Sequence, residues 1–231
     1  MTAGRVVLWR HGRTAWNAGA RLQGQSDIPL DEVGLWQAAT AAQALAGQHR
    51  VTRIVSSDLG RAYATAQALG EVTGVSVQTD IRLRERSFGD WEGLTGDEIA
   101  TGWPEQQKIW RAGGHPEGIN AESRATVQAR MTQAVHAYAA DLDRDDVLVV
   151  VSHGAAIGSC LTGLLGLPAE WRGLSGMSNA HWAEVVPTRP GTDPAWTVQV
   201  LNFGPVWASS DWNAGPDTEA QSLAEEVRDP A

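Results

Sequence analysis

The apolar run at residues 147–151 is the sequence feature that most restricts the fold of this chain. An unbroken apolar strand has to be covered on both faces, as in the middle of a parallel sheet. A second apolar run covers residues 6–9, and shorter strands are indicated at 53–57 and 75–77. Helical segments at 32–45, 61–73, 122–141 and 155–165 alternate with these strands, and strands at 182–186 and 196–201 follow a short helix near 170–173. The pattern predicts an α/β fold: a three-layer sandwich with a mainly parallel central sheet and helices on both faces.

Each of the two long apolar runs is followed, two residues after its end, by a histidine and a glycine. Arg10, His11 and Gly12 follow the first run, and His153 and Gly154 follow the second. The carboxyl ends of parallel strands meet at one edge of a sheet, which is where α/β proteins place ligands. An arginine fork suits a phosphoryl group, a histidine can act as a nucleophile, and a helix start attracts anions. The alternative is a strand followed by a solvated turn, but the repeated junction favours a site.

Two further charged residues lie where they could reach the same edge. Arg61 is near a helix start that follows the 53–57 strand, so it either faces the site or lies on the surface. Glu85 lies in a loop punctuated by glycine, between Arg84 and Arg86. It either forms a solvated pair with these arginines or holds a carboxyl group next to a phosphate pocket.

The chain is expected to form one domain over residues 1–214, since its length gives one sizeable core. Residues 95–122 show little periodicity and are the candidate lid, inserted over the sheet. Residues 215–231 are acidic and poor in large apolar side chains, so we expect a frayed tail.

The composition argues against some classes of partner and favours one cellular compartment. A net charge of -9 argues against nucleic acid as a partner, and no apolar run is long enough to cross a membrane. No secretory signal precedes the first strand, and the single cysteine, Cys160, agrees with a reducing compartment. The expected location is cytoplasmic. The eleven tryptophans are more often core or interface residues than sugar-stacking platforms.

Taken together, these residues resemble the histidine phosphatase superfamily, which has the phosphoglycerate mutase-like fold. The pieces that carry the resemblance are Arg10-His11-Gly12-Arg13-Thr14 with Asn17, Ser57-Asp58-Leu59-Gly60-Arg61-Ala62 with Thr65, Leu83-Arg84-Glu85, Gly89-Asp90-Trp91-Glu92-Gly93-Leu94-Thr95 and Ser152-His153-Gly154. They come in the family's order over most of the first 160 residues. Two departures are Arg13, where members often carry Gln or Glu, and Ala121, where relatives often have Gly before Glu-Ser. Arg13 could widen the positive pocket or face solvent.

The resemblance implies a catalytic set and a binding set. His11 would be the nucleophile that is transiently phosphorylated, Arg10, Arg61 and His153 would surround the phosphoryl oxygens, and Glu85 would be the general acid and base. Asn17 would be a further donor. Gln23, Gly24, Arg84 and Gly154 are the remaining candidates for substrate contacts, with loop solvation as the alternative for the first three. No cofactor or metal is implied.

The resemblance also implies a small phosphorylated metabolite as partner and makes a homodimer an expectation. The segment Phe88-Gly89-Asp90-Trp91-Glu92-Gly93-Leu94-Thr95 resembles the phosphatase branch, so hydrolysis is favoured over the mutase reaction. Similarity to actinobacterial members suggests glucosyl-3-phosphoglycerate as a substrate. The alternatives are a broad phosphatase of sugar phosphates or ribazole phosphate, a phosphoglycerate mutase, and a non-catalytic phosphate-binding module.

Overall fold

The computed structural model of the protein describes residues 2–207 and 209–216. Its strands are β1 (Arg5–Arg10), β2 (Val51–Ser56), β3 (Val77–Thr79), β4 (Val147–Ser152), β5 (Trp182–Pro187) and β6 (Trp196–Phe203). Its helices are α1 (Ala15–Ala18), α2 (Glu32–Gln48), α3 (Gly60–Thr73), α4 (Gly96–Gly102), α5 (Pro104–Arg111), α6 (Arg124–Ala139), α7 (Gly154–Leu164) and α8 (Ser209–Ala214). Among these described residues, no helix is long and apolar enough to cross a membrane.

The six strands form one sheet in the order β3-β2-β4-β1-β5-β6. Neighbouring strands are parallel from β3 to β1, and β5 runs antiparallel to both β1 and β6. The register places Arg10 opposite Ser152, so β1 and β4 end side by side. The two histidines that follow these strands therefore start from the same edge of the sheet.

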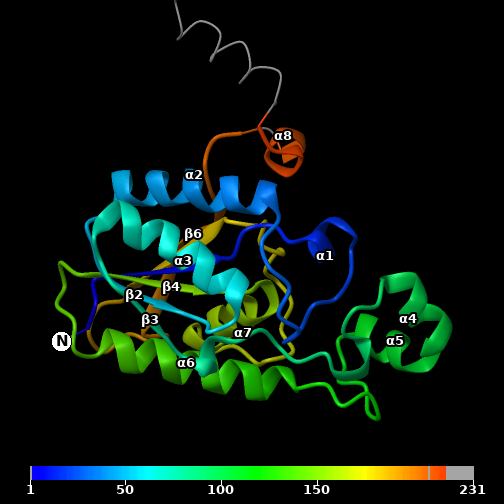
Figure 1. Ribbon diagram of the computed structural model, residues 1–231. Helices are drawn as coiled ribbons and strands as arrows, with labels where there is room; N and C mark the ends of the chain where they lie inside the picture. The colour runs from blue at the N-terminus through cyan, green and yellow to red at the C-terminus, as the bar shows by residue number, and fades with distance from the viewer. Residues whose placement is uncertain (1, 208, 217–231) are drawn as a thin grey trace, which may run out of the picture.

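Two apolar layers enclose the sheet, as Figure 1 shows, with α2 and α3 on one face and α6 and α7 on the other. The alternating side chains of β1 divide between them, because successive strand residues point to opposite faces. Val6 and Leu8 pack with α6 and α7, whereas Val7 and Trp9 pack with α2 and α3. The predicted three-layer, mainly parallel α/β fold is confirmed.

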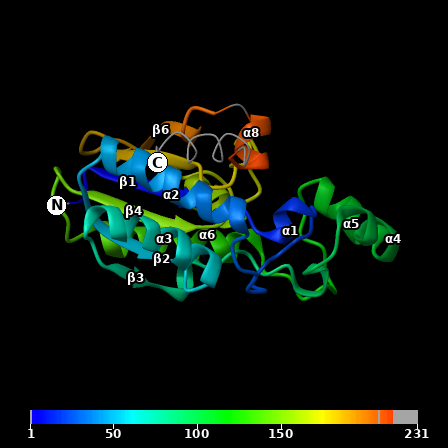
Figure 2. The ribbon, with the colours of Figure 1, turned by 45° about the horizontal axis from the view of Figure 1, so that its top comes forward.

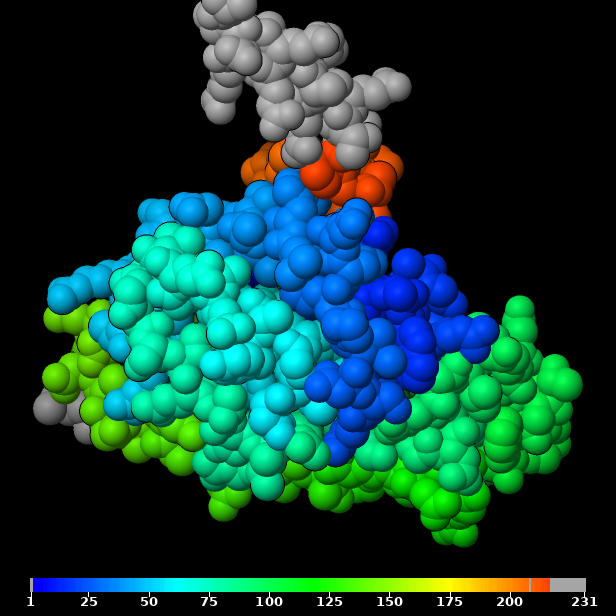
Figure 3. Space-filling view, in the orientation of Figure 1, coloured from blue at the N-terminus to red at the C-terminus, as the bar shows by residue number. Residues whose placement is uncertain are grey.

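The segment 95–122 forms α4 and α5 and projects beyond the carboxyl edge of the sheet, next to α1 (Figure 2). A third apolar cluster holds it there, with Phe88, Trp91, Ile99 and Ile119 at its centre and Trp110 packed against them. In the space-filling view of Figure 3 the segment forms a bulge beside the chain that follows β1. Its role as a lid stays a prediction.

Several predicted elements differ in detail from the observed ones. β3 begins at Val77 rather than at 75, and α6 begins at Arg124, where the Ser123 side chain caps it. The short helix expected near 170–173 is absent, because the chain makes only a turn in which the Trp171 N–H donates to the Pro168 carbonyl. α8 was not expected, and most of the proposed tail, 217–231, lies outside the described residues.

Close backbone contact fixes the loop after β1 on the first turn of α2. Asp31 caps this helix by accepting a hydrogen bond from the Gly34 N–H at 2.7 Å. A Cβ on Gly12 would lie 2.3 Å from the Gly34 carbonyl oxygen, and a Cβ on Gly34 would lie 1.9 Å from the Arg13 carbonyl oxygen. Glycine is therefore required at both positions for the backbone next to His11 to be placed.

We predict that Gly34→Ala lowers the free energy of unfolding by about 1–3 kcal/mol, as overpacking does, and displaces the loop that carries His11. Gly47→Ala in the same helix is the matched control, since nothing lies within 4 Å of its Cβ, and it should stabilise by about 0.5–1 kcal/mol. Urea unfolding of both variants measures this difference. Equal stabilities would contradict the contact.

Candidate active site

His11 follows the last residue of β1 and is 3% exposed. Its backbone N–H donates to the Ser152 carbonyl, and its own carbonyl accepts from Ala180, so both neighbouring segments fix it. The ring Nδ1 lies 2.6 Å from the Gly12 carbonyl oxygen. A carbonyl can only accept, so Nδ1 carries the hydrogen and Nε2 keeps its lone pair. The ring is therefore held in the tautomer of a nucleophile.

His153 follows β4 and is fully buried, with its ring centroid 5.1 Å from that of His11. The Arg61 Nε–H donates to His153 Nδ1 at 3.3 Å, so the hydrogen of the neutral ring lies on Nε2. This Nε2 is buried and has no partner among the described protein atoms. The two histidines thus take opposite tautomers, one offering a lone pair and the other an N–H.

The surroundings keep both rings neutral. Burial lowers the pKa of His11 well below its ordinary value of 6.5, and the charges of Arg10 and Arg61 lower it further. The pKa of His153 is likewise well below 6.5, first because of burial and then because of Arg61. A neutral His11 is the form that can attack phosphorus.

Two guanidinium groups supply positive charge beside the rings. Arg61 is fully buried, and its Nη1 and Nη2 donate to the carbonyls of Ser26 and Gly24 at 2.7 and 2.6 Å. Arg10 donates through Nη1 to the Met177 carbonyl, and its buried Nε has no partner among the described protein atoms. Burial lowers the pKa of both guanidinium groups. Arginine nevertheless stays charged in proteins.

Glu85 occupies the start of α7, where the sequence suggested that an anion would bind. Its Oε1 accepts from the N–H groups of Arg86 and Ala156, both at 2.8 Å, and its Oε2 accepts from Ala155 at 3.1 Å. The side chain is 8% exposed and lines the same cavity as His11. The helix terminus therefore holds the carboxyl group in a fixed orientation toward the site.

An amide network holds Asn17 against the loop of His11. Asn17 Oδ1 accepts from the Thr14 N–H at 3.2 Å and from Asn179 Nδ2 at 3.1 Å, so its own amide hydrogens are left for the cavity. Asn179 also donates to the carbonyls of His11 and Gly12. The sequence analysis assigned no role to Asn179, because its contacts come from the loop before β5 and not from a local motif.

The loop with Gln23 and Gly24 is tied down by Glu92. This carboxylate accepts from the N–H groups of Gln25 and Ser26 at 3.1 and 3.0 Å and from that of Phe88 at 3.0 Å. Gly24 has φ +56°, and a Cβ there would lie 2.1 Å from a Glu92 oxygen. Gln23 Oε1 is buried without a protein partner among the described residues. Glu92 lies in one of the motifs that resemble the family, but the sequence alone indicates no role for it.

These residues enclose a cavity of about 340 Å³. Eight of the ten residues predicted as catalytic or binding line it: Arg10, His11, Asn17, Gln23, Gly24, Arg61, Glu85 and Gly154. His153 lies behind it, in contact with Arg61. Further lining residues, not predicted, are Arg21, Leu22, Phe88, Ala155, Gly176 and Met177. They come from loops, and neither spacing nor charge in the sequence marked their orientation.

Arg84 is the one predicted site residue that the structure places elsewhere. Its Nε and Nη2 form a two-bond pair with the Asp58 carboxylate, and Arg84 does not line the cavity. Arg13, whose direction was left open, neither widens the cavity nor stands free in solvent. It pairs with Asp31 at 2.9 Å and donates to the Asn213 carbonyl, which fastens α8 to the loop after β1.

None of the 95–122 residues lines this cavity. Trp110 instead lies behind Phe88, with ring centroids 5.6 Å apart, and under the Arg86 guanidinium at 4.4 Å. Within the described part of the chain, no group of three or more His, Cys, Asp or Glu side chains could hold a metal ion. The arrangement offers a nucleophilic nitrogen, an acid or base, and a set of donors for an anion.

Comparisons with known proteins agree with this chemistry. Glucosyl-3-phosphoglycerate phosphatase of Mycobacterium tuberculosis is 39% identical over 233 residues, which cover 96% of this chain and 100% of that protein. A probable phosphoglycerate mutase of Yersinia pestis is 41% identical over 170 residues, 72% of this chain and 77% of its own.

The chain is also similar to solved structures of phosphatases. The mycobacterial glucosyl-3-phosphoglycerate phosphatase in complex with VO3 is similar with a TM-score of 0.76 at 41% identity, covering 86% of this chain and 98% of that chain. Phosphoserine phosphatase of Entamoeba histolytica in complex with 3-phosphoglyceric acid reaches 0.73 at 26% identity, covering 87% and 98%. The model of the histidine phosphatase superfamily (branch 1) matches residues 6–202. The resemblance seen in the sequence is confirmed: the chain belongs to the histidine phosphatase superfamily.

Proposed function

We propose that this protein is a phosphatase that hydrolyses small phosphate monoesters through a phosphohistidine on His11. The observation that carries the proposal is the pair of histidines in opposite tautomers, with His11 in the cavity and His153 behind it. His11 Nε2 offers a lone pair, and His153 Nε2 offers a hydrogen next to two guanidinium groups. A phosphoryl group needs one nucleophile and several donors for its oxygens, and this set supplies both.

In the first half-reaction, His11 Nε2 attacks the phosphorus atom. The Nε2–P bond forms as the P–O bond to the leaving group breaks, and Arg10, Arg61 and the His153 Nε2–H bind the three peripheral oxygens. Glu85 protonates the departing oxygen, after receiving a proton that a monoanionic ester can carry into the site. The alcohol then leaves, and the phosphoryl group stays on His11.

In the second half-reaction, water takes the place of the alcohol. Glu85 accepts a proton from this water as its oxygen bonds to phosphorus, the Nε2–P bond breaks, and inorganic phosphate departs. The positive charges that neutralise the phosphoryl oxygens come from arginine, so we propose a reaction without a metal ion.

The proposed substrate is glucosyl-3-phosphoglycerate. The support is the name and the near-complete coverage of the mycobacterial relatives. A broad phosphatase is the second candidate, and the similarity to a probable phosphoglycerate mutase keeps the transfer to a second alcohol as a third. Cys160 is the single cysteine and cannot form an intramolecular disulfide, which supports the proposed reducing, cytoplasmic location. The homodimer stays a prediction.

Turnover is to be measured with a chelator present. The protein should release phosphate from glucosyl-3-phosphoglycerate faster than from sugar phosphates, ribazole phosphate or 3-phosphoglycerate, and a radiolabelled ester should label His11. His11→Ala should lose both turnover and label, whereas His49→Ala, which removes a histidine at the amino end of β2, should keep both. Phosphate binding without release would indicate a binding module, and isomerised phosphoglycerate would indicate a mutase.

Glu85→Gln tests the proton transfer. We expect hydrolysis of alkyl esters to fall by about 10²- to 10⁴-fold, the usual contribution of an acid or base. With p-nitrophenyl phosphate, whose leaving group needs no proton, the variant should give a rapid burst of p-nitrophenol and then accumulate phosphohistidine. Glu92→Gln is the control for lost loop contacts and should slow both esters alike. An absent burst would assign Glu85 a positioning role only.

The lowered pKa values of the two histidines predict the acid side of the pH profile. Because attack requires neutral His11, activity should persist below pH 6.5 and fall only as the pH passes through the lowered pKa of His11. NMR titration of the ring carbons measures the pKa directly in the free protein. A ring that titrates near 6.5, as in a short peptide, would contradict the burial of His11.

A further inference from the structure

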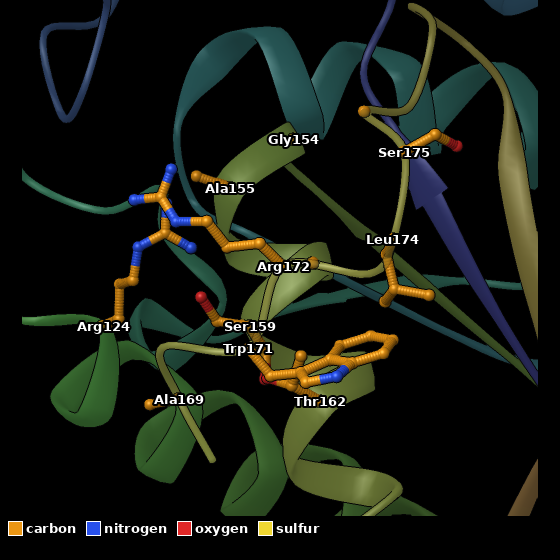
Figure 4. A pocket seen from close by; sticks show the side chains of 12 residues that line it. Arg124, Gly154, Ala155, Ser159, Thr162, Ala169, Trp171, Arg172, Leu174 and Ser175 are labelled. Atoms are coloured by element: carbon orange, nitrogen blue, oxygen red, sulfur yellow. The ribbon is translucent and has the colours of Figure 1, made fainter. Parts of the chain in front are cut away.

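A second cavity of about 340 Å³ adjoins the one that contains His11. Gly154, Ala155 and Gly176 line both cavities, so the two share a wall. The second cavity lies between the first turns of α7, the start of α6 and the segment 169–176, as Figure 4 shows. The catalytic groups described above do not depend on it.

Two arginines from separate elements meet in this cavity. Arg124 is the first residue of α6, and Arg172 lies in the loop after α7. Figure 4 shows their guanidinium groups side by side near Ala155. The Nε of Arg124 is buried without a protein partner among the described residues. Burial, followed by the charge of Arg172, lowers the pKa of Arg124.

Protein carboxylates do not neutralise this pair. Among the described residues, neither Arg124 nor Arg172 has a carboxylate oxygen within 4.0 Å, and Glu170 is the one acid whose charge reaches Arg124. Arg172 donates to the Trp110 carbonyl at 3.1 Å, and the Arg124 guanidinium lies 5.8 Å from the Trp110 ring. Two like charges held this close, one of them on the partly buried Arg124, favour an anionic ligand between them.

The wall that the two cavities share determines which part of a substrate would enter the second cavity. Glu85 is bonded to the N–H groups of Ala155 and Ala156, so the proposed acid stands at the boundary of the two cavities. An ester whose phosphorus is next to His11 and whose bridging oxygen faces Glu85 has its leaving group directed toward Ala155. Because Ala155 lines both cavities, an alcohol part that extends in this direction reaches the second cavity.

Resting on the proposed phosphatase function, we propose that the second cavity binds the leaving group and that Arg124 and Arg172 bind a carboxylate on it. The substrate class is then a phosphate ester of a hydroxy acid. Trp171 is 40% exposed and lines the same cavity, so its indole offers a flat face to the remainder of the alcohol, such as a sugar ring.

A matched pair of esters separates this role from a general loss of activity. 3-Phosphoglycerate carries a carboxylate where glycerol 3-phosphate carries a hydroxymethyl group. Arg124→Gln and Arg172→Gln should each lower kcat/KM for 3-phosphoglycerate by about 10- to 100-fold, mainly through KM, because hydrogen bonds to a charged group are lost. The values for glycerol 3-phosphate should stay nearly unchanged. Arg50→Gln, an exposed arginine before β2, is the control for net charge.

Each outcome of this experiment decides the proposal. Equal losses for both esters would assign the arginines to holding Trp110 and would overturn it, whereas partial recovery in Arg124→Lys for 3-phosphoglycerate alone would support it. A variant that loses more with a bisphosphate lacking a carboxylate would make the ligand a second phosphate and overturn the carboxylate assignment. If the wild-type protein releases phosphate from no ester, the proposed function itself has failed.

Discussion

The buried guanidinium of Arg61 is the interaction on which the rest of the site depends. A fully buried cation costs several kcal/mol to desolvate, and here its closest carboxylate, that of Asp27, lies 3.9 Å away. Its hydrogen bonds go to the Gly24 and Ser26 carbonyls and to His153 Nδ1. One group therefore fixes the loop at the cavity mouth and the tautomer of one histidine, and it helps to keep the other histidine neutral.

Glu92 completes this arrangement from the other side of the same loop. Its oxygens accept from the backbone of Gln25, Ser26 and Phe88, so the loop is tied both to α3 through Arg61 and to the segment before α4. Both attachments hold the carbonyls of Gly24 and Ser26 toward Arg61. Distant parts of the chain are thereby coupled through two charged side chains, of which Arg61 lines the cavity and Glu92 does not.

Much of the fold could be predicted from the sequence, because the apolar runs that end in His11 and His153 require a doubly covered sheet and a common edge. Arg10, His11 and Gly154 line one cavity for the same reason, whereas Asn17, Gln23 and Gly24 were assigned from the resemblance to the family. The direction of single side chains could not be predicted. Arg84 turns to Asp58 and Arg13 turns to Asp31, since a carboxylate within reach decides where an arginine points, and that carboxylate comes from another element.

A chain with net charge -9 can receive an anion because the pairing of its arginines differs between the cavities and the rest of the surface. Most of the described arginines outside the two cavities have a carboxylate within 4.0 Å, among them Arg13, Arg53, Arg82, Arg84 and Arg130. Three that line the cavities, Arg10, Arg124 and Arg172, have none. Charge screening in water acts over about 8 Å at physiological salt, so the acidic surface has little influence on a ligand that has reached these groups. The desolvation of Arg10 and Arg124 opposes folding, and an anion that fits the cavities offsets part of it. Selectivity then follows from which cations are left unpaired, and not from the total charge of the protein.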